Sequence, residues 1–87
     1  MNQVESQASA LAVAEALRDL GREERRLIEE GKLDALHVLA SRRAKLLRLL
    51  DRTLEPGWPT DPTVHALLEQ VRQEGAQNLA LLRRVRN

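Results

Sequence analysis

Hydrophobic residues recur three or four positions apart over the first third of the chain. This spacing predicts an amphipathic helix over about residues 4–30, beginning near Val4 or Ser6. Gly31 is the expected stop, because glycine adopts the left-handed conformation of a helix C-cap at little cost. One position of the stripe, Glu24, carries a carboxylate. Its apolar members are Ala10, Leu11, Val13, Leu17, Leu20, Leu27 and Ile28.

A second stripe predicts a helix over about residues 33–54. Asp34 is placed to accept hydrogen bonds from the free amides at its start, as an N-cap residue does. Again one position of the stripe, Arg43, is charged. The apolar members are Leu36, Leu39, Ala40, Leu46, Leu47, Leu50 and Leu54.

Residues 55–61 form a proline-rich loop that cannot continue the helix. Its Trp58 is expected either to close the hydrophobic end of a bundle or to lie exposed as a contact residue. A third helix is predicted over about residues 62–86, with Thr60 or Asp61 as its cap and Pro62 in its first turn. Its stripe comprises Val64, Leu67, Leu68, Val71, Leu82 and Val85, interrupted by Gly75, which permits close helix approach, and Asn78, whose amide needs a partner.

The short Gly31–Lys32 connection forces the first two helices into an antiparallel hairpin. Opposing positions then sum to about 67, which pairs Leu27 with Ala40, Leu20 with Leu47, Leu17 with Leu50 and Val13 with Leu54. The same register places the two charged positions, Glu24 and Arg43, opposite each other. We therefore predict a partly buried ion pair between them, and hypothesise that it fixes the register of the hairpin.

The fold class is accordingly all-α, a single helical domain over residues 1–87. The third helix can complete a three-helix bundle, or it can offer its stripe to another chain, and periodicity does not choose between these arrangements. Composition agrees with the fold class: the chain holds 17 Leu and 11 Ala but no Phe, Tyr or Cys, and Ile28 is its only isoleucine. Such a composition lacks the residues that β-sheets favour.

Charge and composition also narrow the function classes. The 14 basic and 13 acidic residues nearly cancel, and Trp58 is the only aromatic residue, so neither the overall field nor a stacking platform favours nucleic acid. Without cysteine, disulfides and thiolate metal sites are excluded. We find neither a spanning hydrophobic segment nor a secretory signal, and expect a cytoplasmic protein that does not insert into membranes.

Catalytic and metal-binding chemistry finds no support. The two histidines, His37 and His65, lie on different predicted helices and are expected to be solvated. Neighbouring carboxylates such as Glu23 and Glu24 point about 100° apart on a helix and so do not converge. The serines lack a histidine and carboxylate context. We therefore expect no enzyme activity, no cofactor and no metal. The basic series Lys45, Arg48 and Arg52, and the C-terminal Arg83, Arg84 and Arg86, are interpreted as solvated surface and helix-end cations.

The hairpin resembles flagellar export chaperones of the FlgN/FliT type. The similarity is carried by residues 27–36, Leu-Ile-Glu-Glu-Gly-Lys-Leu-Asp-Ala-Leu, and by the basic residues before the Leu46–Leu47 pair. The positions of Glu24 and Arg43 also match that family, and residues 77–82 are similar to the Asn-containing, Leu-rich stretch of its third helix. The chain departs from the family in being shorter and in carrying Lys32 at the turn.

The resemblance implies a chaperone that binds a late flagellar, or related type III secretion, substrate through apolar helix surfaces and can deliver it to the export apparatus. Its first candidate contacts with the client are Val71, Asn78, Leu79 and Leu82, each of which can equally belong to the core. A homo-oligomeric scaffold or regulatory adaptor is the alternative. A helical enzyme of the chorismate mutase type, faintly similar around Leu17-Arg18-Asp19, is a further one.

Overall fold

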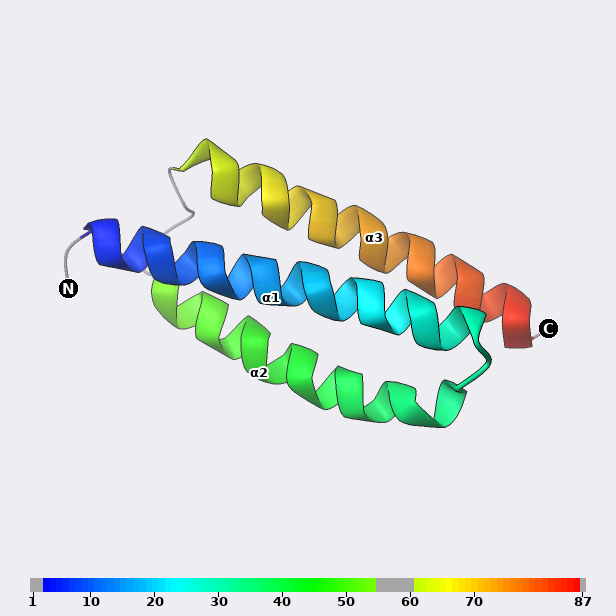
Figure 1. Cartoon of the computed structure of the whole chain (residues 1–87). Helices are drawn as coiled ribbons and strands as arrows, with labels where there is room; N and C mark the ends of the chain where they lie inside the picture. The colour runs from blue at the N-terminus through cyan, green and yellow to red at the C-terminus, as the bar shows by residue number, and fades with distance from the viewer. Residues whose placement is uncertain (1–2, 55–60, 87) are drawn as a thin grey trace.

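The protein consists of helices, as the computed structural model shows (Figure 1). The structure describes residues 3–54 and 61–86, with side chains for residues 10–52 and 61–85. Its elements are α1 (Gln3–Glu29), the short 3₁₀ helix η1 (Leu33–Ala35), α2 (Leu36–Leu54) and α3 (Pro62–Arg86). The all-α prediction is confirmed, and the helix boundaries agree with the expected ones to within three residues.

Gly31 ends α1 as expected. Its φ of 75° is the only positive φ value in the described residues. The amide of Lys32 donates to the carbonyl of Leu27 at 2.9 Å, and the amide of Gly31 donates to that of Ile28 at 3.1 Å. This pair of hydrogen bonds is the Schellman motif, which satisfies carbonyls that the helix leaves without a partner and reverses the chain.

The start of α2 differs from the prediction. Asp34 lies within the 3₁₀ turn η1, so it does not directly precede the α-helix as its N-cap. The residue before η1, Lys32, makes no side-chain capping bond. The chain leaves the Schellman motif in a tight turn, and a 3₁₀ turn is a common way to enter a helix from such a connection.

Asp61 caps α3. Its Oδ1 accepts a hydrogen bond from the amide of Thr63 at 2.9 Å, and its carbonyl accepts one from the amide of His65 at 3.1 Å. With Pro62 as the first helical residue, this start follows the prediction. The expectations for Trp58 and Thr60 lie outside the described residues, as does the side-chain pairing of Leu54.

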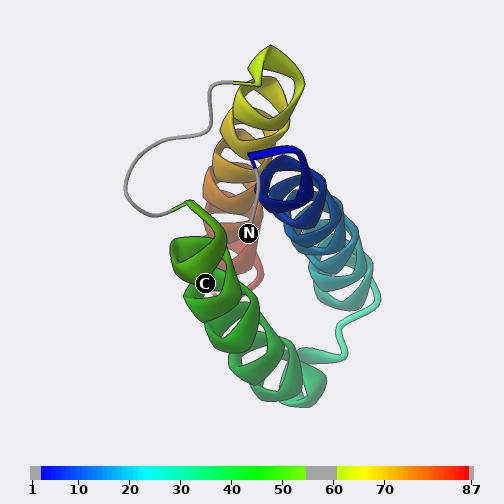
Figure 2. The ribbon, with the colours of Figure 1, turned by 90° about the vertical axis from the view of Figure 1, so that its left-hand side faces the viewer.

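In the view of Figure 1, helix α1 lies between the other two helices; seen end on in Figure 2, the three helices stand at the corners of a triangle. Helix α1 packs antiparallel to α2 and parallel to α3. In the described part of the chain, no Cα atom of α2 lies within 8 Å of one of α3. The backbone extends over 47 × 21 × 16 Å. The third helix is thus docked on α1. The backbones of α2 and α3 both approach α1 closely, but they do not approach each other.

Two hydrophobic clusters hold the helices together. The first joins all three helices near the end where α2 leads into α3, and its buried members are Ala10, Leu17, Leu50 and Val64. The second lies near the Gly31 turn and is formed by α1 and α2, through Leu20, Leu27 and Leu39. Because α3 adds no side chain to the second cluster, the later turns of α3 depend on other contacts with α1.

The predicted hairpin register is correct where it can be compared at Leu17 and Leu50, which share the first cluster. For Leu20 and Leu27 the level agrees to within one position, but the predicted partners, Leu47 and Ala40, are wrong because they do not face α1. Leu20 and Leu27 pack against Leu39, whereas Leu47 is 45% exposed and Ala40 is exposed as well. The reason is rotational: α2 turns the side carrying Leu39 and Leu46 toward α1, and α3 does not approach to cover the other side.

Candidate functional site

An ion pair joins α1 to α2 in the middle of the hairpin. Arg43 Nη1 donates to Glu24 Oε2 at 2.9 Å. The Glu24 side chain is 15% exposed and that of Arg43 is 33% exposed, so the pair is partly buried. The predicted pair is confirmed. It lies within the span of the second cluster, between Leu20 and Leu27 of α1 and between Leu39 and Leu46 of α2, where each helix replaces one apolar position of its stripe with a charge.

Asn78 extends this pair into a network that includes α3. Its Nδ2 donates to the backbone carbonyl of Gly21 at 2.8 Å and to Glu24 Oε1 at 3.0 Å. Glu24 therefore accepts a hydrogen bond from each neighbouring helix, one on each carboxylate oxygen. The prediction that the Asn78 amide needs a hydrogen-bond partner is confirmed. The network also connects α3 to α1 at a point beyond the first cluster.

The network leaves acceptors unpaired in the interface between α1 and α3. Asn78 Oδ1 and Glu74 Oε2 are buried and have no hydrogen-bond partner within the described residues. The other carboxylate oxygen of Glu74, Oε1, does have a partner: it accepts a hydrogen bond from Gln70 Nε2 at 3.1 Å. Both acceptors lie beside Gly21 of α1: Glu74 Oε2 would be 3.8 Å from a Cβ atom built on Gly21, and Asn78 donates to the Gly21 carbonyl.

The four residues expected to contact a client occupy different environments. Asn78 is 1% exposed and belongs to the interior, so we withdraw it as a surface contact. Val71 and Leu82 are half-buried, and Val71 packs against the first cluster. Leu79 is 49% exposed, the most exposed large hydrophobic side chain in the described part of the chain. Of the four, Leu79 is the one placed for contact with another molecule.

Gly75 does not serve close packing, contrary to the expectation. A Cβ atom built on it would meet no atom within 4 Å among the described residues. At Gly21 a Cβ atom would meet only Glu74 Oε2, at 3.8 Å, which is ordinary contact. Position 75 therefore faces open space on α3 rather than the backbone of a neighbouring helix.

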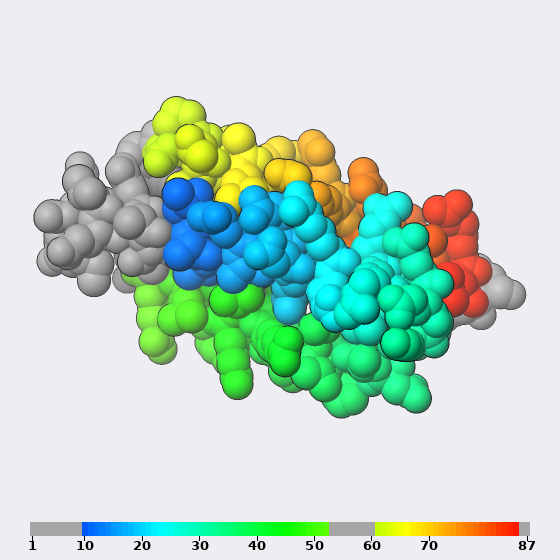
Figure 3. Space-filling model, viewed as in Figure 1, coloured from blue at the N-terminus to red at the C-terminus, as the bar shows by residue number. Residues whose placement is uncertain are grey.

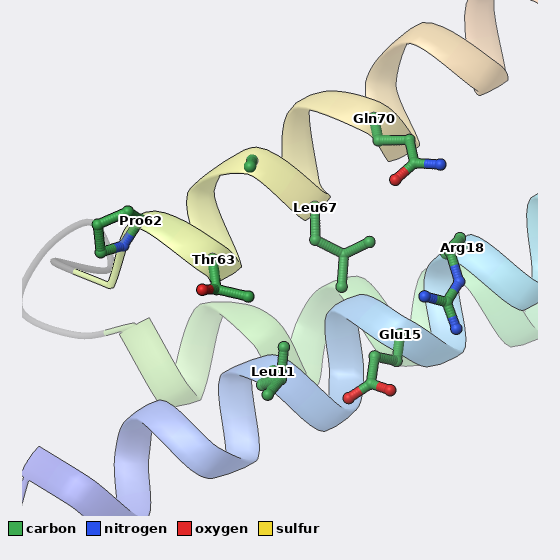
Figure 4. Close-up of a pocket in the computed structure, with 8 residues that line it drawn as sticks. Leu11, Glu15, Arg18, Pro62, Thr63, Leu67 and Gln70 are labelled. Carbon is green, nitrogen blue, oxygen red and sulfur yellow. The ribbon is translucent and has the colours of Figure 1, made fainter.

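Two surface grooves show which side of α2 and which side of α3 lie along the outer surface of α1. One runs between α1 and α3 (Figure 4), where Leu67 extends from α3 toward α1; it is lined by Leu11, Glu15, Arg18, Thr63, Leu67 and Gln70, among others. The other runs between α1 and α2 and is lined by Ala16, Asp19, Leu20, Glu23, Leu39, Arg42, Lys45 and Leu46. In the space-filling view, α1 separates α3 from α2 (Figure 3).

Each groove marks the side of α2 or α3 that faces outward beside α1. The other side of each helix therefore faces the space between α2 and α3, where only α1 connects the two backbones. By helical spacing, the residues on those sides are Ala40, Ala44 and Leu47 of α2 and Gly75, Leu79 and Leu82 of α3. We call these six residues the open side. Leu47 follows Arg43 by one turn and Leu79 adjoins Asn78, so both exposed leucines flank the Glu24 network.

Exposed charges on α1 and α3 are largely paired within their own helix. Hydrogen bonding to Glu23 raises the pKa of Arg26, and hydrogen bonding to Glu69 raises that of Arg72. The carboxylates respond in the opposite direction: Arg72 lowers the pKa of Glu69, and Lys32 lowers that of Glu30, in each case mainly through a hydrogen bond. Arg72 precedes Gly75 by three positions and Leu79 by seven, so its pair with Glu69 borders the open side on α3.

The described residues contain no group of three or more His, Asp or Glu side chains that could hold a metal ion. His37 is exposed, with Nδ1 2.5 Å from the carbonyl of Asp34. Among the described helices, none has the length and apolar character needed to cross a membrane. Comparison of the chain with family models, with curated proteins and with solved structures gives no match.

Sequence reasoning missed Leu47 as a candidate contact, because position 47 belongs to the apolar stripe and was assigned to the hairpin core. The available signal was the width of that stripe. Both Leu46 and Leu47 occupy it, and a helix that contacts only one neighbour needs one of the two. The missing partner helix, rather than the residue type, leaves Leu47 exposed.

Proposed function

We propose that this protein is a cytoplasmic chaperone that binds an amphipathic helix of a late flagellar, or related type III, export substrate at the open side between α2 and α3. The observation that carries the proposal is the wide separation of α2 and α3, whose Cα atoms nowhere come within 8 Å of each other in the described residues. Beyond the first cluster, where their side chains meet, the three helices have the arrangement of a four-helix bundle with one corner missing, and a helix would fill that corner.

The chemistry of the open side supports a helical client. Leu47 is 45% exposed and Leu79 is 49% exposed, and alanine and glycine between them present little bulk. Such a surface accepts large apolar side chains from an incoming helix, spaced three or four residues apart. Covering it would remove both leucines from water, at roughly 25 cal/mol per Å² of apolar surface.

The Glu24 network gives the open side a polar centre. Arg43 is one-third exposed although it points toward α1, since α3 does not cover it. Its guanidinium has five N–H donors, and one of its nitrogens, Nη1, contacts Glu24. A client helix with a polar or acidic side chain at this level would gain a hydrogen bond and a defined register. Binding in this way needs no catalytic step, and it keeps the client's apolar face from premature assembly.

The resemblance to the FlgN/FliT type supplies the class of client. The residues that carry it include the Gly31 turn and the Glu24 and Arg43 positions, and these are the features that set the geometry of the hairpin. Delivery to the export apparatus is part of the same proposal, as the function that such chaperones perform.

The test uses purified full-length protein and synthetic peptides that cover the terminal helices of late flagellar export substrates from the same cell. Leu47→Ser combined with Leu79→Ser should weaken peptide binding at least about tenfold, because both apolar anchors are lost. The matched control is Val38→Ser combined with Leu49→Ser. It removes two aliphatic side chains of similar exposure, 43% each, from another side of α2. This control should bind as the unmodified protein does.

Two results would overturn the proposal. One is equal binding by the open-side variant and the unmodified protein. The other is concentration-dependent self-association that disappears in the open-side variant while no peptide binds, which would make a second copy of the chain the occupant and the protein a homo-oligomeric scaffold.

A further inference from the structure

Helix α2 carries an unusual share of the positive charge of a nearly neutral chain. It contains five basic residues and one acidic residue over Leu36–Leu54, whereas the whole chain has a formal net charge of +1. Arg43 is paired with Glu24. The other four, Arg42, Lys45, Arg48 and Arg52, are exposed and make no ion pair with any side chain of residues 10–52 or 61–85.

Three of these cations share one side of α2 with two exposed aliphatic residues. The positions are Val38, Arg42, Lys45, Leu49 and Arg52, which we call the outer stripe. They are separated by four, three, four and three residues, the spacing with which one helix faces another in a coiled coil. The stripe extends about 21 Å along the helix at 1.5 Å per residue.

The outer stripe lies on the opposite side of α2 from the open side. Arg42 and Lys45 line the outer groove with α1, while Leu47 and Ala44 face the gap toward α3. Asp19 and Glu23 of α1 line the same groove, but their carboxylates are held by Arg18 and Arg26. The cations of the stripe therefore keep their charge available to a second molecule.

We propose that the outer stripe of α2 docks an acidic amphipathic helix of a partner protein. Carboxylates of the partner would pair with Arg42, Lys45 and Arg52, and its apolar side chains would pack on Val38 and Leu49. Charge complementarity supplies the attraction and its orientation, and the two aliphatic positions, each 43% exposed, supply the register.

The pattern fits a helix better than it fits a polyanion or a membrane. Nucleic acid is bound by cations that track phosphates, and such a surface has no use for Val38 and Leu49 within the row. Insertion into an anionic membrane surface requires a broad apolar face, whereas here two aliphatic side chains share the row with three cations. The proposal stands independently of the client site, since none of the outer-stripe residues belongs to the open side.

The test measures binding of a fluorescent 21-residue peptide, designed with leucine and glutamate at the positions complementary to the outer stripe, by anisotropy. A scrambled peptide of identical composition and charge serves as the first control. We expect the designed peptide to bind at least about tenfold more tightly than the scrambled one, and to weaken steeply between about 0.05 M and about 0.5 M salt.

Variants assign the binding to the stripe. Lys45→Glu combined with Arg52→Glu should reduce affinity for the designed peptide at least about tenfold. Val38→Ser combined with Leu49→Ser should reduce it several-fold and bring it close to that of the scrambled peptide. Arg83→Glu combined with Arg84→Glu changes the charge equally on exposed positions of α3 and should leave binding intact. Leu47→Ser combined with Leu79→Ser should also leave it intact, which separates this surface from the client site.

Equal binding of the designed and scrambled peptides, or no binding of either, would overturn the proposal. So would tighter binding of a 20-base-pair DNA duplex, or of vesicles containing phosphatidylglycerol, that is lost in the Lys45 and Arg52 variant. In that case the stripe would be a polyanion or membrane surface.

Discussion

Asn78 on α3 donates a hydrogen bond to Glu24 Oε1 on α1 at 3.0 Å, while Arg43 on α2 donates to the other oxygen of the same carboxylate at 2.9 Å. One side chain thus contacts both neighbouring helices at the level where the apolar stripes of all three are interrupted. Because no Cα atom of α2 comes within 8 Å of one of α3 in the described residues, this carboxylate and the first cluster are the places where the orientation of one helix can influence the other.

Asn78→Ala should lower the free energy of unfolding by about 2–3 kcal/mol, because it removes two hydrogen bonds and leaves a cavity at a fully buried position. Asn78→Asp should cost more at pH 7, since it replaces the donating amide with a second carboxylate beside Glu24. Urea denaturation followed by circular dichroism measures both. The two costs should converge at about pH 4, where carboxylates take up protons; a cost of Asn78→Asp independent of pH would contradict the network.

A double-mutant cycle on Glu24 and Arg43 should give a coupling energy of about 1 kcal/mol, because the pair is partly buried and hydrogen-bonded. Glu24→Ala alone should cost more than Arg43→Ala alone, since loss of the carboxylate also removes the acceptor of Asn78. The hypothesis that the pair fixes the register predicts more than stability. In the Glu24→Ala variant, a disulfide between cysteines introduced at positions 17 and 50 should form more slowly than in the parent. Coupling near zero would remove the hypothesis.

Gly75→Ala should stabilise the protein by about 0.5–1 kcal/mol, because a methyl group there meets no atom within 4 Å among the described residues and alanine is the better helix former. Gly31→Ala should destabilise by about 1 kcal/mol, since its φ of 75° is unfavourable for a residue with a Cβ atom. Both changes are measured by urea denaturation. A destabilising Gly75→Ala would show that α3 is closely packed at this position.

The pKa of Glu69 should lie below its ordinary value of 4.5, because Arg72 donates hydrogen bonds to its carboxylate. A pKa lower in the folded than in the unfolded state contributes stability above pH 4.5, and this contribution is lost as the pH falls through the folded value. Carboxyl chemical shifts measured by NMR titration report it directly. Arg72→Gln should return the pKa toward 4.5, and high salt should act in the same direction since the pair is exposed.

Much of the fold was predictable because each local signal has a local cause. The apolar stripes gave the helices, Gly31 gave the turn through its left-handed conformation, and Asp61 with Pro62 gave the start of α3. The Glu24–Arg43 pair was predictable too, since a short connection fixes the level at which opposing positions meet. Once the direction of two helices is set, counting residues from the turn is enough.

The candidate site was less predictable, and Leu47 and Asn78 show why. Both occupy core positions of an apolar stripe by spacing, yet the leucine is 45% exposed and the amide is 1% exposed. Spacing tells which side of a helix is apolar, but it does not tell which arc of that side a neighbour covers. That depends on how α2 and α3 rotate around α1.

By itself, then, the sequence determined the three helices, where the chain turns, and one ion pair across the hairpin, because these follow from contacts between residues near in sequence or held at a fixed level by a short turn. Only the tertiary structure decided that α3 packs parallel to α1, that it stays apart from α2, and that an apolar side is left open between them. Those features depend on how α2 and α3 are rotated around α1, because each rotation buries a different set of apolar side chains. In this structure the first cluster and the Glu24 network hold both helices on α1, and their backbones stay apart from each other.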